Sequence, residues 1–339
     1  MTRDRSALRL GLLGLLGVAA ALVASTAVGS HALPFGRALS LWWAPSPAAR
    51  PWETAILFDV RLPRAVVAAL GGAGLGLSGA AMQGLFRNAL AEPGVLGVSS
   101  GATLGAVLAI YAGSAPLLAV PGAAFLGALA SASLVHRLAH VGGLPSTSSL
   151  LLAGVAVSGV AGALGSLVLT LSVADWELGR QILSWMMGGL EGRSWSHAAL
   201  AGPPIAVGFG LLMLRSRELD ALALGEDSAA SLGVDVPALR RSVLALTALT
   251  TGATVAVMGA VGFLGLMAPH VVRALVGPSH RAVLPGSALM GALGMLGADA
   301  LCRSVSGSVD LRPGVVMALL GGPFFLALMV RQARARIPS

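Results

Sequence analysis

Long stretches of this sequence contain no charged residue, and they constrain the fold more than any other feature. An α-helix needs about 20 consecutive apolar residues to cross the hydrocarbon core of a bilayer. Uncharged runs of that length recur along the whole chain. Only 11% of the residues are charged and 56% are hydrophobic, whereas soluble domains carry about 25% charged residues. The sequence therefore predicts an all-α, polytopic protein embedded in a lipid bilayer.

Proline and glycine divide the longer runs, and the division predicts about ten transmembrane helices. The run Pro93–Val135 is too long for one helix, and Pro116 and Pro121 split it into two. The run Ser242–Val272 is expected to hold two helices, broken around Gly259–Gly262. The remaining spans are expected at 10–30, 65–86, 149–174, 194–214, 282–298 and 313–330. We expect one transmembrane domain over residues 1–339, with no separate soluble domain.

The distribution of arginine predicts the orientation of these spans. Ten spans place both termini on one side. If that side is the cytoplasm, 14 of the 22 basic residues lie inside and 8 lie outside. Loops on the cytoplasmic side carry the excess of positive charge in membrane proteins. We therefore expect both termini in the cytoplasm. The first run resembles a signal peptide, but its apolar core is longer than the usual 7–15 residues, which favours an uncleaved helix.

The net charge of +8 raises the possibility of a nucleic-acid partner. The arginines, however, lie in short loops between apolar runs and have few aromatic neighbours. Topology-setting charge explains them, so no nucleic-acid partner is expected. Cys302 is the only cysteine, which excludes an intrachain disulfide and a thiolate metal cage. We expect no metal ion or cofactor bound by this chain.

One sizeable polar segment, residues 215–241, is expected on the cytoplasmic side. Asp227–Ser231 is compatible with a short helix, and Gly225 and Gly233 are suitable ends for it. Leucines in this segment could form an apolar edge beside acidic residues. Such a helix can dock into a groove of a partner protein. A helix lying on lipid headgroups is the alternative, but it would favour basic residues.

Several short sequence blocks occur in order between residues 61 and 325. The blocks are Arg61–Arg64, Ser78–Gln83, Phe86–Asn88, Leu90–Pro93, Leu96–Ala102, Leu224–Glu226, Leu232–Val234, Gly262–Leu266, Pro269–His270, Gly297–Asp299 with Arg303, and Leu320–Phe325. Taken together, they resemble the permease family of ABC importers for cobalamin, haem and iron–siderophore complexes.

The resemblance implies a transport subunit rather than an enzyme. It implies two copies of the chain around a central path, two cytoplasmic ATPase subunits that bind ATP and Mg, and an external substrate-binding protein. The chain itself lacks the Gly-x-x-x-x-Gly-Lys-[Ser/Thr] motif of a P-loop. The expected location is the bacterial inner membrane. The expected cargo is a large metal chelate, namely an iron–siderophore or haem, and cobalamin is the alternative.

The resemblance also assigns roles to particular residues. The contact with the ATPase is expected at Leu224, Gly225, Glu226, Leu232, Gly233 and Val234. Docking of the binding protein is expected at Arg61, Arg64 and Arg303, because guanidinium groups pair with carboxylates in bidentate geometry. A local ion pair between Asp299 and Arg303, spaced i and i+4, is the alternative for the last of these. Cytoplasmic gates are expected at Asn88 with Leu90 and at Thr147 with Ser148; N-capping is the alternative for residues 146–149.

Two readings from other classes remain as remote alternatives. Gly76–Gly79 matches the Gly-x-Ser-Gly pattern of rhomboid-like intramembrane proteases, with His270 as a possible base. A chain this rich in glycine shows such a pattern roughly 0.5 times by chance. An ion-coupled secondary transporter would place ionisable residues near the centres of its spans, and the expected spans carry none there.

Overall fold

The structure is a computed structural model that describes residues 2–28, 35–43, 51–113, 118–140, 147–305 and 311–335. Every regular element in these ranges is helical, which confirms the predicted fold class. Seven helices are long and apolar enough to cross a membrane, and three shorter apolar helices accompany them. Together they make the predicted ten. Pro116, expected to separate two of the spans, lies outside the described residues.

The ten apolar helices follow the predicted order. They are α1 (Thr2–Ala27), α4 (Leu62–Phe86), α5 (Val98–Tyr111), α6 (Ala119–Ala139), α7 (Thr147–Leu171), α9 (Trp195–Leu214), α12 (Val236–Met258), α13 (Leu264–Val276), α14 (His280–Val305) and α15 (Pro313–Ala335). The shorter elements are α2 (Phe35–Trp43), α3 (Pro51–Ala55), the π-helical turn Ile56–Arg61, the 3-10 turn Pro93–Leu96, α8 (Trp176–Met186), α10 (Ser216–Leu222) and α11 (Glu226–Ser231).

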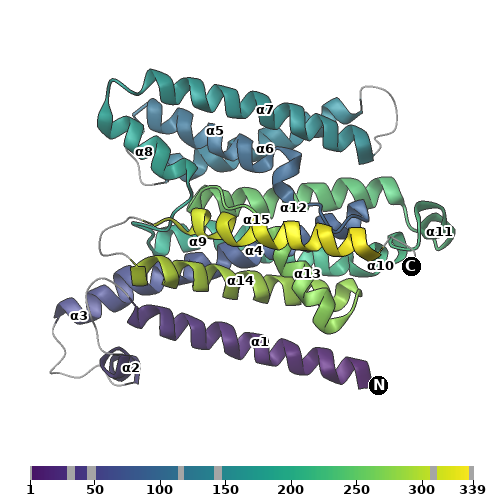
Figure 1. The fold of residues 1–339 in the computed structure, drawn as a ribbon, viewed down its shortest axis with the longest axis horizontal. Helices are drawn as coiled ribbons and strands as arrows, with labels where there is room; N and C mark the ends of the chain where they lie inside the picture. The colour runs from purple at the N-terminus through teal and green to yellow at the C-terminus, as the bar shows by residue number, and fades with distance from the viewer. Residues whose placement is uncertain are drawn as a thin grey trace.

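Helix α4 lies at the centre of the bundle and is buried along most of its length (Figure 1). Glycine makes this possible, because a residue without Cβ lets two helix backbones approach closely in a membrane. A Cβ added at Gly72 would meet the carbonyl of Gly291 in α14, and one added at Gly76 would meet the carbonyl of Ser287. Gly72 and Gly76 therefore allow the close contact between α4 and α14.

The predicted break between α12 and α13 is confirmed. Gly259 ends α12 with a φ of 72°, and Phe263 precedes α13 with a φ of 65°. A left-handed conformation is uncommon for a residue with a side chain. The break leaves α13 with 13 residues, about 20 Å of helix at 1.5 Å per residue, which is shorter than the hydrocarbon core.

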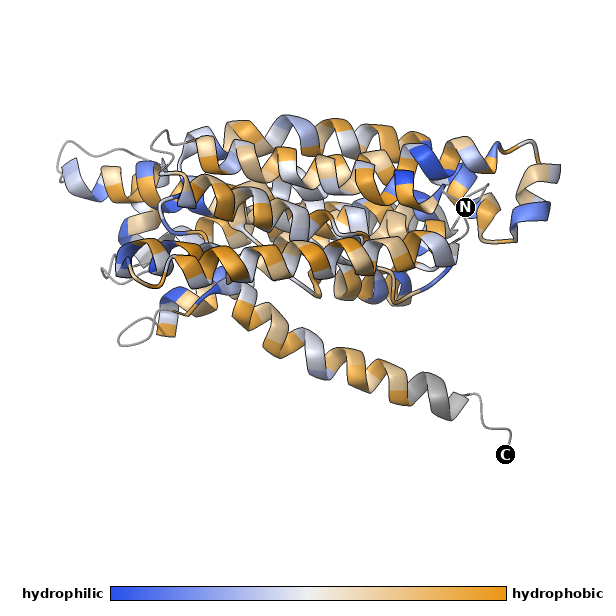
Figure 2. Ribbon diagram, turned by 90° about the horizontal axis from the view of Figure 1, so that it is seen from above, coloured by the Kyte–Doolittle hydropathy of each residue, from blue (hydrophilic) through white to orange (hydrophobic). Residues whose placement is uncertain are grey.

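The two ends of the bundle differ. Figure 1 places the start of α1, the end of α15, α10 and α11 at one end, and α2, α3 and α8 at the other. We refer to these as the α11 end and the α8 end. Figure 2 shows that α15 diverges from the rest of the bundle toward its C-terminus. Both termini lie at the α11 end, and the cytoplasmic orientation of that end stays a prediction.

Candidate functional site

Two of the three arginines predicted to dock a binding protein, Arg64 and Arg303, pair with one buried carboxylate at the α8 end. Asp299 is fully buried, and its Oδ1 lies 2.8 Å from Arg64 while its Oδ2 accepts a 2.9 Å hydrogen bond from Arg303 Nε. Arg61 is 7% exposed and donates to the carbonyl of Thr26 at 2.9 Å. The predicted i, i+4 ion pair between Asp299 and Arg303 is therefore present.

These internal partners limit the contact that the predicted docking arginines could make with a binding protein. The side chains of Arg64 and Arg303 are only 17% and 11% exposed. The geometry matches the local ion-pair alternative for Arg303 and extends it to Arg64. Docking on an acidic partner stays a prediction for all three arginines, and it would involve only the edges of their guanidinium groups that the chain leaves exposed.

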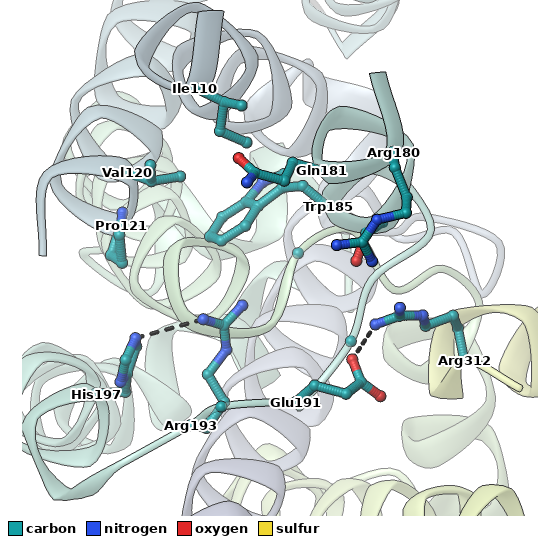
Figure 3. A pocket seen from close by; sticks show the side chains of 14 residues that line it. Ile110, Val120, Pro121, Arg180, Gln181, Trp185, Glu191, Arg193, His197 and Arg312 are labelled. Atoms are coloured by element: carbon teal, nitrogen blue, oxygen red, sulfur yellow. Dashed lines mark hydrogen bonds and ion pairs between the residues drawn. The ribbon is translucent and has the colours of Figure 1, made fainter. Parts of the chain in front are cut away.

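A cavity of about 530 Å³ lies beside this cluster at the α8 end (Figure 3). Its walls come from α5, α6, α8, α9, the start of α15 and the loop 187–194. The lining residues are Ile110, Val120, Pro121, Arg180, Gln181, Ser184, Trp185, Gly189, Glu191, Gly192, Arg193, His197, Gly259 and Arg312. Among the described residues, three arginines and one carboxylate line it, so this part of the lining is cationic.

The charged groups of the cavity form a connected set. Arg312 donates to the carboxylate of Glu191, and Arg64 lies 3.6 Å from the same group. The guanidinium of Arg193 lies 5.2 Å from the ring centre of Trp185 and 3.4 Å from His197 Nε2. Burial lowers the pKa of Arg193 to about 10, with Glu191 opposing that effect and Arg312 adding to it. Arg193 therefore remains cationic at neutral pH.

The loop that carries Glu191 and Arg193 is held against the break between α12 and α13. Gly188 has a φ of 67°, and the N–H of Gly189 donates to the carbonyl of Met258 at 2.9 Å. A Cβ at Gly188 would collide with the backbone of Ala260. Glycine at 188 thus allows the backbone approach that positions both charged residues. Sequence reasoning missed this site, because its residues come from segments far apart in the chain.

The predicted coupling residues lie at the α11 end. Gly225 and Gly233, with φ of 121° and 85°, bracket α11, which begins at Glu226, one residue before the predicted start. Leu224 and Leu232 are 69% and 65% exposed. Val234 N–H donates to the carbonyl of Ala229 at 3.0 Å, and Glu226 pairs with Arg240 at 2.8 Å. Residues 236–241 of the expected loop belong to α12 instead.

Asp220 in α10 connects this end to α14. Its Oδ1 accepts from the backbone N–H of His280 at 2.7 Å and lies 2.7 Å from His280 Nδ1, while its Oδ2 accepts from the Ser279 hydroxyl at 3.0 Å. The buried faces of Leu219 and Leu222 hold α10 in place. Sequence reasoning did not single out Asp220, because its partners lie about 60 residues further along the chain.

The two predicted gate pairs also lie toward the α11 end. Asn88 is exposed, and its side-chain oxygen accepts from the N–H of Leu90 at 2.9 Å, which forms a tight turn after α4. Thr147 is the first residue of α7, and Ser148 is exposed beside it. Ser146, part of the capping alternative, lies outside the described residues. The gating role of all four residues stays a prediction.

The residues of the protease alternative serve packing. The Ser78 hydroxyl is fully buried and shares a hydrogen bond with Thr250 of α12. The ring of His270 packs edge-on against Phe324, with 5.6 Å between ring centres. Within the described ranges, no three His, Cys, Asp or Glu side chains gather in a way that could hold a metal ion.

Comparisons with known proteins point in one direction. The FecCD transport family matches residues 16–331. The chain is 42% identical to the cobalamin import system permease protein BtuC of Halobacterium salinarum, over 91% of this chain and 83% of that protein. It is 40% identical to the hemin transport system permease protein HmuU of Yersinia pestis, over 98% of both. A solved inward-facing metal-chelate type ABC transporter matches with a TM-score of 0.84 at 32% identity, over 95% of this chain and 99% of that chain.

Proposed function

Because this chain belongs to the FecCD transport family, we propose that two copies of it enclose a path through the bacterial inner membrane for a large metal chelate. The chain is a permease subunit of an ABC importer of the metal-chelate, haem and vitamin B12 type. The pairing of two copies is what the resemblance to importer permeases implies. Helices α7 and α15 expose large apolar side chains, including Leu152, Leu167, Leu319 and Leu326, as suits surfaces that face lipid or a second copy.

The α11 end is proposed as the contact with a cytoplasmic ATPase, and this places both termini in the cytoplasm. The observation that carries this proposal is the pair of exposed leucines, Leu224 and Leu232, on either side of α11. Leucines exposed on a polar segment are typical of a surface that a partner covers. The Asp220 contact with α14 offers a mechanical route from that surface into the bundle.

The proposed cargo is an iron–siderophore or haem. The relatives leave cobalamin open as the alternative, because the named cobalamin and hemin permeases are 42% and 40% identical to this chain. A substrate-binding protein is proposed to deliver the cargo at the α8 end. The basic character of that end, with four arginines around Asp299 and Glu191, supports an acidic partner surface.

Replacing both exposed leucines by aspartate, Leu224→Asp with Leu232→Asp, is expected to weaken ATPase association by at least about 100-fold. Burying one leucine contributes about 1.5–3 kcal/mol, and 1.4 kcal/mol corresponds to about tenfold. Association is measured between the purified permease and its ATPase. The matched control, Leu224→Met with Leu232→Met, keeps the apolar surface and should bind as the parent does. If the aspartate variant bound the ATPase as tightly as the parent does, this surface would remain exposed to water in the complex.

A further inference from the structure

The cavity at the α8 end contains two buried hydrogen-bond donors whose partners are missing from the described part of the chain. They are the indole Nε1 of Trp185 and the Nε of Arg193. Both side chains line the 530 Å³ cavity. Leaving a buried donor without an acceptor is unfavourable, because the donor has lost its hydrogen bond to water. A ligand that brings acceptor atoms into the cavity would recover this free energy.

The charges around the two donors select the kind of acceptor. Arg193 stacks on Trp185, and its guanidinium lies 3.4 Å from Nε2 of His197. Glu191 is the one carboxylate among the described residues that line the cavity, and it is already engaged by Arg312 and Arg64. Arg180 is paired outside the cavity with Glu177 at 2.7 Å. Within the described residues Arg193 forms no ion pair, although Glu191 lies close enough to favour its charge, and an anionic acceptor therefore fits it best.

Size and shape agree with an organic ligand. Pockets for small molecules have volumes of about 300–1,000 Å³ with a few convergent polar groups, and this one has about 530 Å³. In Figure 3 the Trp185 side chain lies between Val120 and Pro121 on one side and Arg180 on the other, and the guanidinium of Arg193 approaches from below. An arginine beside an apolar wall suits a carboxylate attached to a hydrocarbon body.

We propose that this cavity binds a carboxylate group of the cargo as it enters at the α8 end, with Arg193 and Trp185 as the donors. The assignment to the cargo rests on the proposed function, whereas the carboxylate site itself does not. A carboxylate side chain of the binding protein is the other source of the same chemistry, and the experiment separates the two.

The test uses the full chain in lipid nanodiscs, labelled with fluorotryptophan, without ATPase or binding protein. Fluorine NMR reports each tryptophan, and Trp185→Phe identifies the resonance of Trp185. The probe is citrate, and its neutral triethyl ester is the uncharged comparison. Citrate is expected to shift the Trp185 resonance in a saturable way, and the ester is not. No citrate-dependent shift, or an equal shift with the ester, would overturn the proposal.

Two arginine variants distinguish citrate binding in this cavity from a general electrostatic attraction of citrate to the α8 end. Arg193→Gln is expected to lower the affinity for citrate at least tenfold. Arg37→Gln is the control, because Arg37 pairs with Glu53 at the same end but does not line the cavity; it should bind citrate as the parent does. An equal loss of citrate affinity in both variants would show that surface charge alone attracts citrate, and it would overturn the proposed site.

A final arm identifies the source of the carboxylate. The purified binding protein is added with and without its cargo. A Trp185 shift that needs the cargo supports the assignment made here, and a shift with the cargo-free binding protein overturns it in favour of a protein carboxylate. Citrate binding does not require transport. A failure of import would therefore count against the proposed function and leave the carboxylate site standing.

Discussion

Replacing Asp299 by alanine is expected to destabilise the folded permease by about 3–5 kcal/mol, the cost of breaking a buried ion pair by removing one partner. Asp299 is fully buried and holds both Arg64 and Arg303 at less than 3 Å. Without it, Arg64 would keep only Glu191, 3.6 Å away, as an anionic partner among the described residues, and Arg303 would keep the backbone carbonyls of Ser25 and Val28.

The thermal unfolding midpoint of the purified protein in detergent measures this effect. Asp299→Asn keeps the shape but not the charge, and it should also unfold at a much lower temperature than the parent. Glu177→Gln is the control, because it removes one member of the exposed pair with Arg180 and should leave the midpoint unchanged. If Asp299→Asn and Glu177→Gln unfolded at the same temperature, the arginine cluster would not stabilise the α8 end.

Two glycine-to-alanine substitutions in the same helix are expected to have opposite effects. Gly291→Ala should destabilise by about 1–3 kcal/mol, because overpacking forces the backbone to shift. Its Cβ would collide with the carbonyl of Gly72 in α4, which is backbone and cannot rotate away. A Cβ at Gly297 meets nothing within 4 Å. Gly297→Ala should therefore stabilise by up to about 1 kcal/mol through the helix propensity of alanine.

The measurement is again the unfolding midpoint, with insertion into the membrane checked by yield. A rise in the midpoint for both variants would contradict the close packing of α4 on α14. A fall for both would mean that glycine at 297 has a role that its surroundings do not reveal. Only a fall for Gly291→Ala with no fall for Gly297→Ala agrees with the packing described here.

The helices could be predicted from the sequence because membrane spans depend on local features. The length of an uncharged run sets a span, and Gly259 breaks α12 and α13 where the sequence indicated. The start of α4 was predicted less accurately from the length of the uncharged run. Arg64 was taken as the boundary of a span, whereas it lies inside a helical segment that continues from Pro51. Asp299 makes this possible by neutralising it from 235 residues away.

The sites were predictable to the extent that their residues are neighbours in sequence. The coupling surface, which stays a prediction, could be proposed from the sequence because Leu224–Val234 is one continuous segment. The Asp220 contact and the Arg193 cavity were not found, since each joins segments that only the fold brings together. Arg61, Arg64 and Arg303, the predicted docking residues, show what the sequence could and could not indicate. The resemblance indicated their location at the α8 end, but the internal carboxylate that holds two of them depends on tertiary structure.

The central claim is that two copies of this chain form the path of an ATP-driven importer. Uptake of a labelled metal chelate into liposomes tests it most directly, with the chain reconstituted together with its ATPase and binding protein. We expect uptake that requires ATP, the binding protein and the α11 surface, so that Leu224→Asp with Leu232→Asp abolishes it. Uptake that continues without ATP, or that is driven by an ion gradient alone, would contradict the account.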